Sequence, residues 1–102
     1  MIQAEVSIYP MGTSTTSASF HIAKAIETIQ NIDGIKYEIN SMGTIIESDS
    51  LDKIFQATQE MSEAVHNLGV GRVEIILKID SRRDKEQTMQ EKLDSVKSQL
   101  KS

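Results

Sequence analysis

The sequence predicts one α+β domain in which strands and helices follow one another along the chain. Some short segments alternate apolar and polar residues, which is typical of strands with one buried face. Others repeat apolar residues at spacings of three and four, which is typical of helices that cover a sheet. No repeat, low-complexity segment or linker interrupts the 102 residues, so we expect a single domain over residues 1–102.

The N-terminal third predicts a strand followed by a helix. Residues 2–9 alternate strictly, and we expect Pro10 to end this strand. A polar loop rich in serine and threonine comes next. An apolar stripe between Ile22 and Ile29 then predicts a helix, and the side chain of Ser17 or Ser19 is a suitable N-terminal cap for it.

The middle of the chain predicts a hairpin, a longer helix and a fourth strand. Residues 35–40 and 44–47 flank a short glycine-bearing connection, as the strands of a hairpin do. Apolar residues then recur at helical spacing over residues 51–68, and Gly69 stands where a helix commonly ends. Residues 73–79 predict the last strand.

The first six elements follow the split βαβ pattern. We therefore predict a ferredoxin-like βαββαβ sandwich whose antiparallel sheet has the strand order 4-1-3-2. An additional charged helix is expected from about residue 84 to residue 101. Its narrow apolar stripe packs either back on the same domain or on a partner subunit. Because Ile76 is an apolar residue on the predicted helix-free sheet face, we expect self-association, as a homodimer or homotetramer.

Composition narrows the classes of function. The formal net charge is −4 and the basic residues are scattered, so we expect neither nucleic acid nor a membrane as a partner. The chain has no cysteine, which excludes disulfides and thiolate chemistry. No apolar run is long enough to span a membrane and no signal segment opens the chain, so we expect a cytoplasmic protein.

One candidate site lies where the predicted topology gathers three loops at one end of the sheet. These loops span residues 10–17, 40–44 and 69–72. Hydroxyl groups are dense there, Thr13 and Thr44 among them, and Arg72 adds a positive charge. Such groups beside a helix N-terminus favour an anion such as a phosphate or carboxylate. The alternative is a solvated turn with ordinary helix capping.

A second candidate site lies on the sheet itself. Its polar residues are Glu5, Ser7, Tyr37, Glu38, Asn40 and Glu47. Glutamate is depleted in strands, and a carboxylate beside an aromatic ring suits a flat, cationic heterocycle. Tyr37 and Glu38 are adjacent, so they point to opposite faces and at most one of them lines a given pocket. The alternative is a solvated sheet face.

No residue pattern indicates catalysis or a metal. His21 and His66 lie on different predicted helices and match no metal-ligand spacing. A nucleophile elbow, a P-loop and a dinucleotide fingerprint are all absent from the sequence. We therefore expect no metal, no required cofactor and no enzymatic activity.

Five segments resemble the thiamine-binding protein family. They are residues 4–13 of the opening strand with the YPMGT turn at residues 9–13, the SAS segment at residues 17–19, the block KYEINSMGTIIE at residues 36–47, the GRV start of the last strand at residues 71–73, and the run KIDSRRD at residues 78–84. The resemblance covers essentially the whole chain. The combination of the turn and the longer block is its most specific part.

The resemblance implies a ferredoxin-like fold, assembly into dimers and tetramers, and binding of thiamine or its hydroxymethylpyrimidine part. It implies no established catalytic activity. Tyr37, Glu38, Thr44 and Glu47 belong to the block that also resembles more distant members. We expect the carboxylate of Glu38 or Glu47 to face the pyrimidine and Tyr37 to form a wall, while Arg72 and the hydroxyls take the phosphate of a phosphorylated form.

The leading interpretation is a non-catalytic carrier or sensor for thiamine or its pyrimidine moiety. Two alternatives remain open. One is an oligomeric regulatory or interaction protein without a small ligand, and the other is an enzyme acting on a phosphorylated metabolite.

Overall fold

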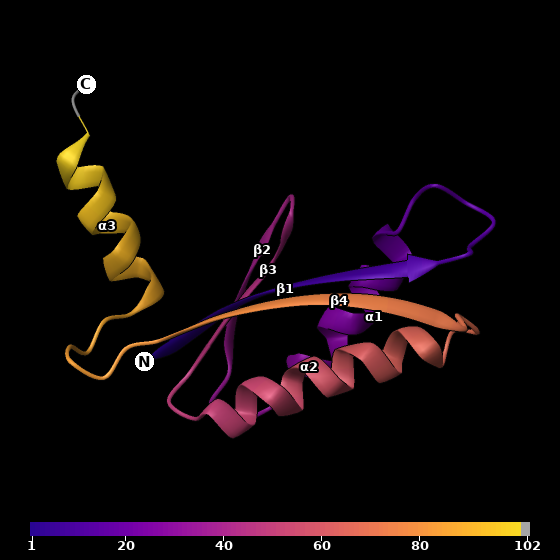
Figure 1. The fold of residues 1–102 in the computed structure, drawn as a ribbon, viewed down its shortest axis with the longest axis horizontal. Helices are drawn as coiled ribbons and strands as arrows, with labels where there is room; N and C mark the ends of the chain where they lie inside the picture. Colours follow the sequence, from indigo (N-terminus) through magenta and orange to yellow (C-terminus); the bar gives the residue numbers. More distant parts are fainter. Residues whose placement is uncertain (101–102) are drawn as a thin grey trace.

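A computed structural model describes residues 1–100, which form one four-stranded antiparallel sheet and three helices (Figure 1). In chain order the elements are β1 (Ile2–Met11), α1 (Ser19–Ile29), β2 (Lys36–Asn40), β3 (Gly43–Ser48), α2 (Leu51–His66), β4 (Arg72–Ser81) and α3 (Met89–Gln99). The sheet order is β2-β3-β1-β4, which is the predicted order 4-1-3-2 read from the other edge. The predicted ferredoxin-like α+β fold is therefore confirmed.

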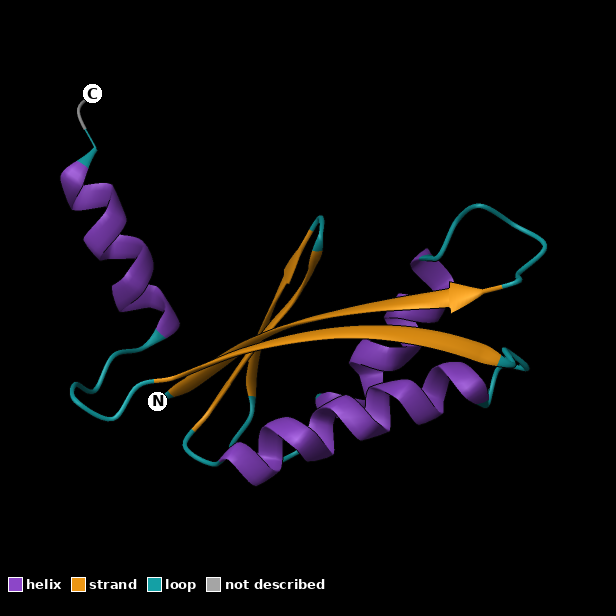
Figure 2. Ribbon diagram, viewed as in Figure 1, coloured by secondary structure: helices purple, strands orange, loops and turns teal. Residues whose placement is uncertain are grey.

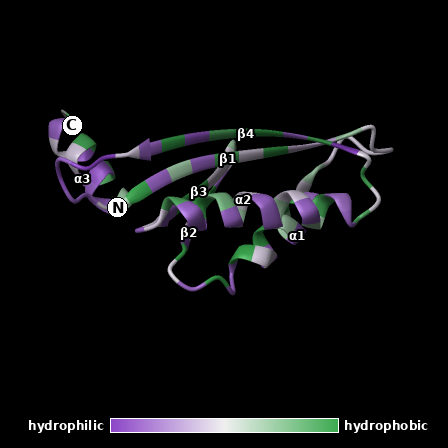
Figure 3. Cartoon of the chain, turned by 60° about the horizontal axis from the view of Figure 1, so that its bottom comes forward, coloured by the Kyte–Doolittle hydropathy of each residue, from purple (hydrophilic) through white to green (hydrophobic). Residues whose placement is uncertain are grey.

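The core lies between the sheet and two helices, α1 and α2, which cover one of its faces (Figure 2). Apolar and polar residues alternate along β1, as the colours of Figure 3 show, and β4 alternates in the same way except at Ile76. This alternation places one set of side chains toward the helices. Full burial of an aliphatic side chain stabilises the fold by about 2 kcal/mol. The largest fully buried apolar side chains are Ile29, Ile46, Ile54, Met61, Val6 and Val65.

The first strand is longer than predicted, because it continues through Pro10 to Met11. It pairs with β3 from Ile2 to Val6 but with β4 as far as Met11. From Ser7 onward it has one neighbouring strand, and a proline is tolerated where a missing N–H breaks no ladder bond. The prediction that Pro10 ends the strand is therefore wrong.

The first helix lacks the cap that we predicted for it. Ala18 occupies the N-cap position, and no side chain there accepts a hydrogen bond from the first turn. Ser17 Oγ instead bonds Ser19 Oγ at 3.0 Å and accepts a long hydrogen bond of 3.5 Å from the N–H of Ser19, the first residue of the helix. Ser17 therefore contacts the start of α1 from the position before the N-cap, and it does not bond the second or third N–H of the helix as a capping serine would.

The last helix begins at Met89, later than the predicted start near residue 84. Thr88 Oγ1 accepts a hydrogen bond from the N–H of Glu91 at 3.1 Å, in the Thr-x-x-Glu spacing of a capping box. Before it, Arg82 and Asp84 pair at 2.7 Å across a turn. The predicted end at residue 101 lies outside the described residues. Over residues 1–100, no helix combines the length and the apolar character needed to cross a bilayer.

Candidate functional site

Two hollows flank the β2–β3 hairpin. The first, which we call the hairpin cavity, has a volume of about 220 Å³ and lies between β1, the hairpin tip and the start of α1. The second, which we call the sheet hollow, measures about 380 Å³ and lies on the helix-free face below α3. Asn40 lines both of them.

The hairpin cavity is mainly apolar. Side chains of the core form its floor, and partly exposed residues of the hairpin tip and of α1 form its rim. Such a hollow with a few polar groups is the usual form of a small-molecule site. The apolar lining residues are Val6, Ile8, Ala18, Ile22, Ala25, Ile39, Met42 and Met61.

The cavity exists because β1 extends beyond the end of its pairing with the neighbouring strand β3. Pairing between them stops at Val6 and Thr44, and the hairpin tip then projects away from the sheet (Figure 1). Beyond that point, alternate backbone N–H and C=O groups of residues 7–11 point toward the hairpin side, where no strand of residues 1–100 pairs with them. Residues 7–9 of this stretch line the cavity, so its apolar lining includes backbone hydrogen-bonding positions.

Gly43 permits the close approach that shapes one side of this cavity. A Cβ atom built on it would lie 3.0 Å from Ser7 Oγ and 3.2 Å from the carbonyl oxygen of Val6. Ser7 Oγ also donates a hydrogen bond to the carbonyl oxygen of Met42 at 3.1 Å. The hairpin tip is therefore tied to β1 at Ser7.

Thr44 supplies the most buried polar side chain of the cavity. It is 3% exposed, and its hydroxyl makes no side-chain hydrogen bond within the part of the chain that the structure describes. The Thr44 hydroxyl is therefore available to a bound molecule.

The sheet hollow has a different chemistry. One row of cross-strand neighbours in it runs Glu38, Ile45, Glu5 and Lys78 over the four strands. In residues 1–100, neither glutamate has an ion-pair partner within 4 Å. Apolar groups of α3 form the roof, and no aromatic residue lines the hollow.

Charged pairs border the hollow at its α3 end. The ammonium group of Lys92 donates to the carboxylate of Asp80, and this contact holds the pKa of Asp80 below its usual 3.8. A similar contact with Arg82 lowers the pKa of Asp84. Both aspartates are solvent-exposed, so these pairs orient the segment before α3 more than they stabilise the fold.

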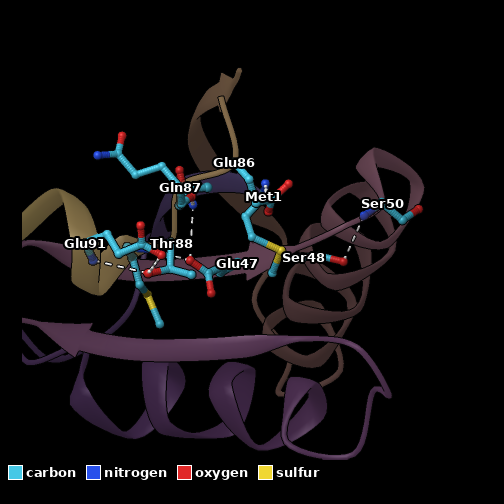
Figure 4. Close-up of polar contacts among 10 residues, drawn as sticks. Met1, Glu47, Ser48, Ser50, Glu86, Gln87, Thr88 and Glu91 are labelled. Atoms are coloured by element: carbon cyan, nitrogen blue, oxygen red, sulfur yellow. Dashed lines mark hydrogen bonds and ion pairs between the residues drawn. The ribbon is translucent and has the colours of Figure 1, made fainter. Parts of the chain in front are cut away.

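Glu47 is not open to either hollow but anchors α3 (Figure 4). Its side chain is buried, and Oε2 accepts hydrogen bonds from Gln3 Nε2 at 3.1 Å and from the N–H of Met89 at 2.5 Å. Gln3 Nε2 also donates to the carbonyl oxygen of Gln87 at 2.8 Å. A carboxylate at the N-terminus of α3 is favoured by the helix dipole.

The structure brings some of the predicted site residues together. Ser7, Asn40 and Thr44 line the hairpin cavity, while Glu38 lines the sheet hollow together with Asn40. Tyr37 lies on the opposite face from Glu38, where its hydroxyl accepts a hydrogen bond from Gln30 Nε2 at 2.9 Å. Tyr37 is therefore no wall for a ligand at Glu38.

Thr13 and Arg72 line neither hollow. Thr13 Oγ1 donates to the carbonyl oxygen of Thr15 at 2.8 Å, and Arg72 pairs with Glu74 at 3.5 Å. The groups expected to hold a phosphate are thus engaged locally at the end of the sheet.

Sequence reasoning missed the apolar walls of the cavity. Ile22 and Met61 belong to helical stripes, and such stripes indicate core positions without showing where the core is left open. Ile39 lies on a strand and is 65% exposed. The sequence could have indicated the cavity through the unequal lengths of the first and third predicted strands, because part of the longer strand then has no neighbour.

Comparison with known proteins gives consistent results over nearly the whole chain. The family model described as thiamine-binding protein matches residues 4–97. A UPF0045 protein of Methanothermobacter thermautotrophicus is 40% identical over 98% of this chain and 100% of its own length. The UPF0045 protein YqgV of Bacillus subtilis is 39% identical over 98% of both chains.

A solved structure agrees with the fold. Hypothetical protein MJ1052 of Methanocaldococcus jannaschii is similar with a TM-score of 0.85 and 45% identity, covering 94% of this chain and 95% of that one.

Proposed function

Because the chain belongs to the thiamine-binding protein family, we propose that it binds the pyrimidine ring of thiamine in the hairpin cavity, as a carrier or sensor and not as a catalyst. One observation carries this proposal. The block at residues 36–47, which strongly resembles the family, supplies residues 39–44 to the lining of this cavity, and Tyr9, the first residue of the turn at residues 9–13, lines it as well.

The size of the cavity favours a single ring. Its volume of about 220 Å³ lies below the roughly 300–1,000 Å³ that is usual for larger ligands. Apolar side chains suit the ring faces, while the Thr44 hydroxyl and the free backbone groups of β1 suit the ring nitrogens and the amino group. A heterocycle that bonds a free strand edge uses the groups that another strand would use.

The cationic thiazolium ring of thiamine then lies outside the cavity, toward Glu38. Glu38 lies on the other face of β2 from the cavity residue Ile39, about 7 Å from Asn40, which lines both hollows, so the ligand reaches Glu38 by passing Asn40. Its carboxylate has no ion-pair partner within 4 Å among residues 1–100. We therefore assign Glu38 to the thiazolium and Glu47 to the positioning of α3.

Filling the cavity tests this proposal. Isothermal titration is performed with hydroxymethylpyrimidine and with thiamine on the wild type and on Ala18→Leu, which adds a side chain inside the cavity. Ala23→Leu on the exposed side of α1 is the matched control. We expect the wild type and the control to bind both ligands and Ala18→Leu to lose both.

Equal affinities for all three chains would place the ligand elsewhere. If the wild type binds neither molecule, an interaction protein without a small ligand is favoured. Turnover of a phosphorylated form of the ligand would favour an enzyme.

We also propose that the chain acts as a homo-oligomer, a dimer or a tetramer. α3 does not fold back along its length, and the apolar residues Leu93, Val96 and Leu100 are 44%, 61% and 68% exposed. On the helix-free sheet face, Ile76 is 62% exposed. A second copy buries such surfaces by symmetry, and sedimentation equilibrium of the wild type measures the assembly.

A further inference from the structure

β4 presents a long, regular free edge. It lies at the outside of the sheet, and its ten residues pair in one unbroken register with β1 (Figure 3). No strand among residues 1–100 pairs with its other side. Natural proteins usually shorten such an edge or interrupt it with a proline or a bulge, because it can recruit another strand. The opposite edge, β2, has five residues.

We propose that two copies of this chain join β4 to β4 in antiparallel orientation, with Ile76 of each copy facing Ile76 of the other on a twofold axis. The two sheets then form one continuous sheet of eight strands. A twofold contact uses the same surface on both copies, so it closes and leaves neither β4 edge free. This pairing specifies a surface for the self-association proposed above and does not depend on the ligand.

The charge pattern of β4 is self-complementary about Ile76. Arg72, Glu74, Ile76, Lys78 and Asp80 lie on the helix-free face, because they alternate along the strand opposite the outward residues of β1. In the proposed register, Arg72 faces Asp80 of the second copy and Glu74 faces Lys78 of the second copy. The twofold axis repeats both contacts, which gives four pairs of opposite charge around an apolar centre.

The neighbouring registers are disfavoured by the same charges. Directly opposed residues share a face, so a twofold register of two identical strands must be centred on a residue. A centre on Ile75 would set Arg72 against Lys78 of the second copy. A centre on Leu77 would set Glu74 against Asp80 of the second copy. Like charges directly opposite each other destabilise a strand pair.

The other face of the joined strands is apolar. There Val73 faces Ile79 of the second copy, and Ile75 faces Leu77 of the second copy. Aliphatic cross-strand pairs of this kind add about 0.2–1 kcal/mol each. In the single chain, Ile75 is 38% exposed and Ile76 is 62% exposed, so both gain burial at the junction.

Within the part of the single chain that the structure describes, the charged groups of β4 have only exposed or partly exposed partners. Arg72 pairs with Glu74 at 3.5 Å, and these side chains are 76% and 52% exposed. Asp80, which is 58% exposed, pairs with Lys92 of α3. Exposed pairs of this kind contribute little to stability. Exchanging them for contacts with the second copy therefore costs little.

Charge reversal tests the register. Glu74→Lys and Lys78→Glu each place like charges opposite one another, and sedimentation equilibrium should show an assembly of half the wild-type size for each variant. When the two variants are mixed, a chain with two lysines at these positions meets a chain with two glutamates. Assembly should return, and native mass spectrometry should show mixed pairs well above the statistical fraction.

Two controls complete the experiment. The double variant Glu74→Lys/Lys78→Glu restores opposite charges and should assemble as the wild type does, which also shows that neither substitution prevents folding. Glu63→Lys makes the same charge change on the exposed side of α2 and should leave the assembly unchanged. A monomeric wild type, single variants that assemble normally, or a mixture that stays dissociated would overturn the proposal.

Discussion

Thr44 and Glu47 are two buried polar residues of one strand, 3% and 2% exposed, yet their surroundings differ. Glu47 accepts two hydrogen bonds and fastens α3 to the sheet. Thr44 faces the hairpin cavity with a hydroxyl that makes no side-chain hydrogen bond in the described chain. Burial alone therefore does not separate a structural residue from a binding residue. The count of hydrogen-bond partners does.

Removing the satisfied carboxylate should have the largest effect on stability. Glu47→Ala leaves the Gln3 amide and the Met89 N–H without their acceptor, at a cost of about 2–4 kcal/mol. Because 1 kcal/mol corresponds to about 4–8 °C in a small domain, thermal denaturation should show a Tm lower by about 10–20 °C. Hydrogen exchange should rise at the start of α3.

Glu47→Gln serves as the milder variant, since an amide oxygen can keep one of the two bonds. Its Tm should lie between those of the wild type and Glu47→Ala. The pyrimidine affinity at a temperature where both variants are folded should equal that of the wild type. A selective loss of affinity would assign Glu47 to the ligand instead.

Removing the cavity hydroxyl of Thr44 should act on binding and not on stability. Thr44→Val keeps the side-chain shape but leaves a ligand group unpaired, so the affinity for hydroxymethylpyrimidine should fall about five- to tenfold in isothermal titration. Thr58→Val is the matched control, because the Thr58 hydroxyl bonds the carbonyl oxygen of Ile54 within α2. A Thr44→Val affinity equal to that of the wild type would contradict the role of this hydroxyl.

Removing the charge of Glu38 should affect the binding of the thiazolium ring and not that of the pyrimidine ring. Glu38→Gln should lower the affinity for thiamine about three- to fivefold, in the range of an exposed ion pair, and leave the affinity for the uncharged pyrimidine unchanged. Added salt should weaken the binding of thiamine to the wild type and have less effect on the variant. An equal loss for both ligands would mean that Glu38 contacts the pyrimidine.

The smallest effect is expected at the exposed pair of Asp80 and Lys92. Lys92 lowers the pKa of Asp80 in the folded state, so the contribution of this carboxylate is present above its unfolded value of 3.8 and is lost as the pH falls through the lower folded value. Near neutral pH it should be constant. Carbon-13 titration of the Asp80 carboxyl should show a midpoint below 3.8, and Lys92→Met should bring it back toward that value. An identical midpoint in both chains would contradict this pairing.

Much of the fold could be predicted from local patterns. Alternation and helical stripes predicted the seven elements, and the split βαβ rule predicted the strand order. The capping box at Thr88 and Glu91 was also present in the sequence and marks the observed start of α3 more closely than its charged composition did.

The site depended on contacts that no local pattern contains. Glu47 accepts a hydrogen bond from the N–H of Met89, which is 42 residues away in the sequence. The sequence therefore showed a carboxylate on a strand but not that it bonds the start of a helix. Alternation did separate Tyr37 from Glu38, as the structure has it. Alternation does not show that β3 leaves the second half of β1 without a neighbour, and that difference in length forms the hairpin cavity.

The central claim is that the hairpin cavity, and not the sheet hollow, holds the pyrimidine. Intermolecular NOEs from the methyl group of hydroxymethylpyrimidine to methyl-labelled protein measure this directly. We predict contacts with Ile22, Ile39 and Met61, which line the cavity. Contacts with Ile45 and Leu93 of the sheet hollow, or a bound ligand without contacts to the cavity methyls, would contradict the account.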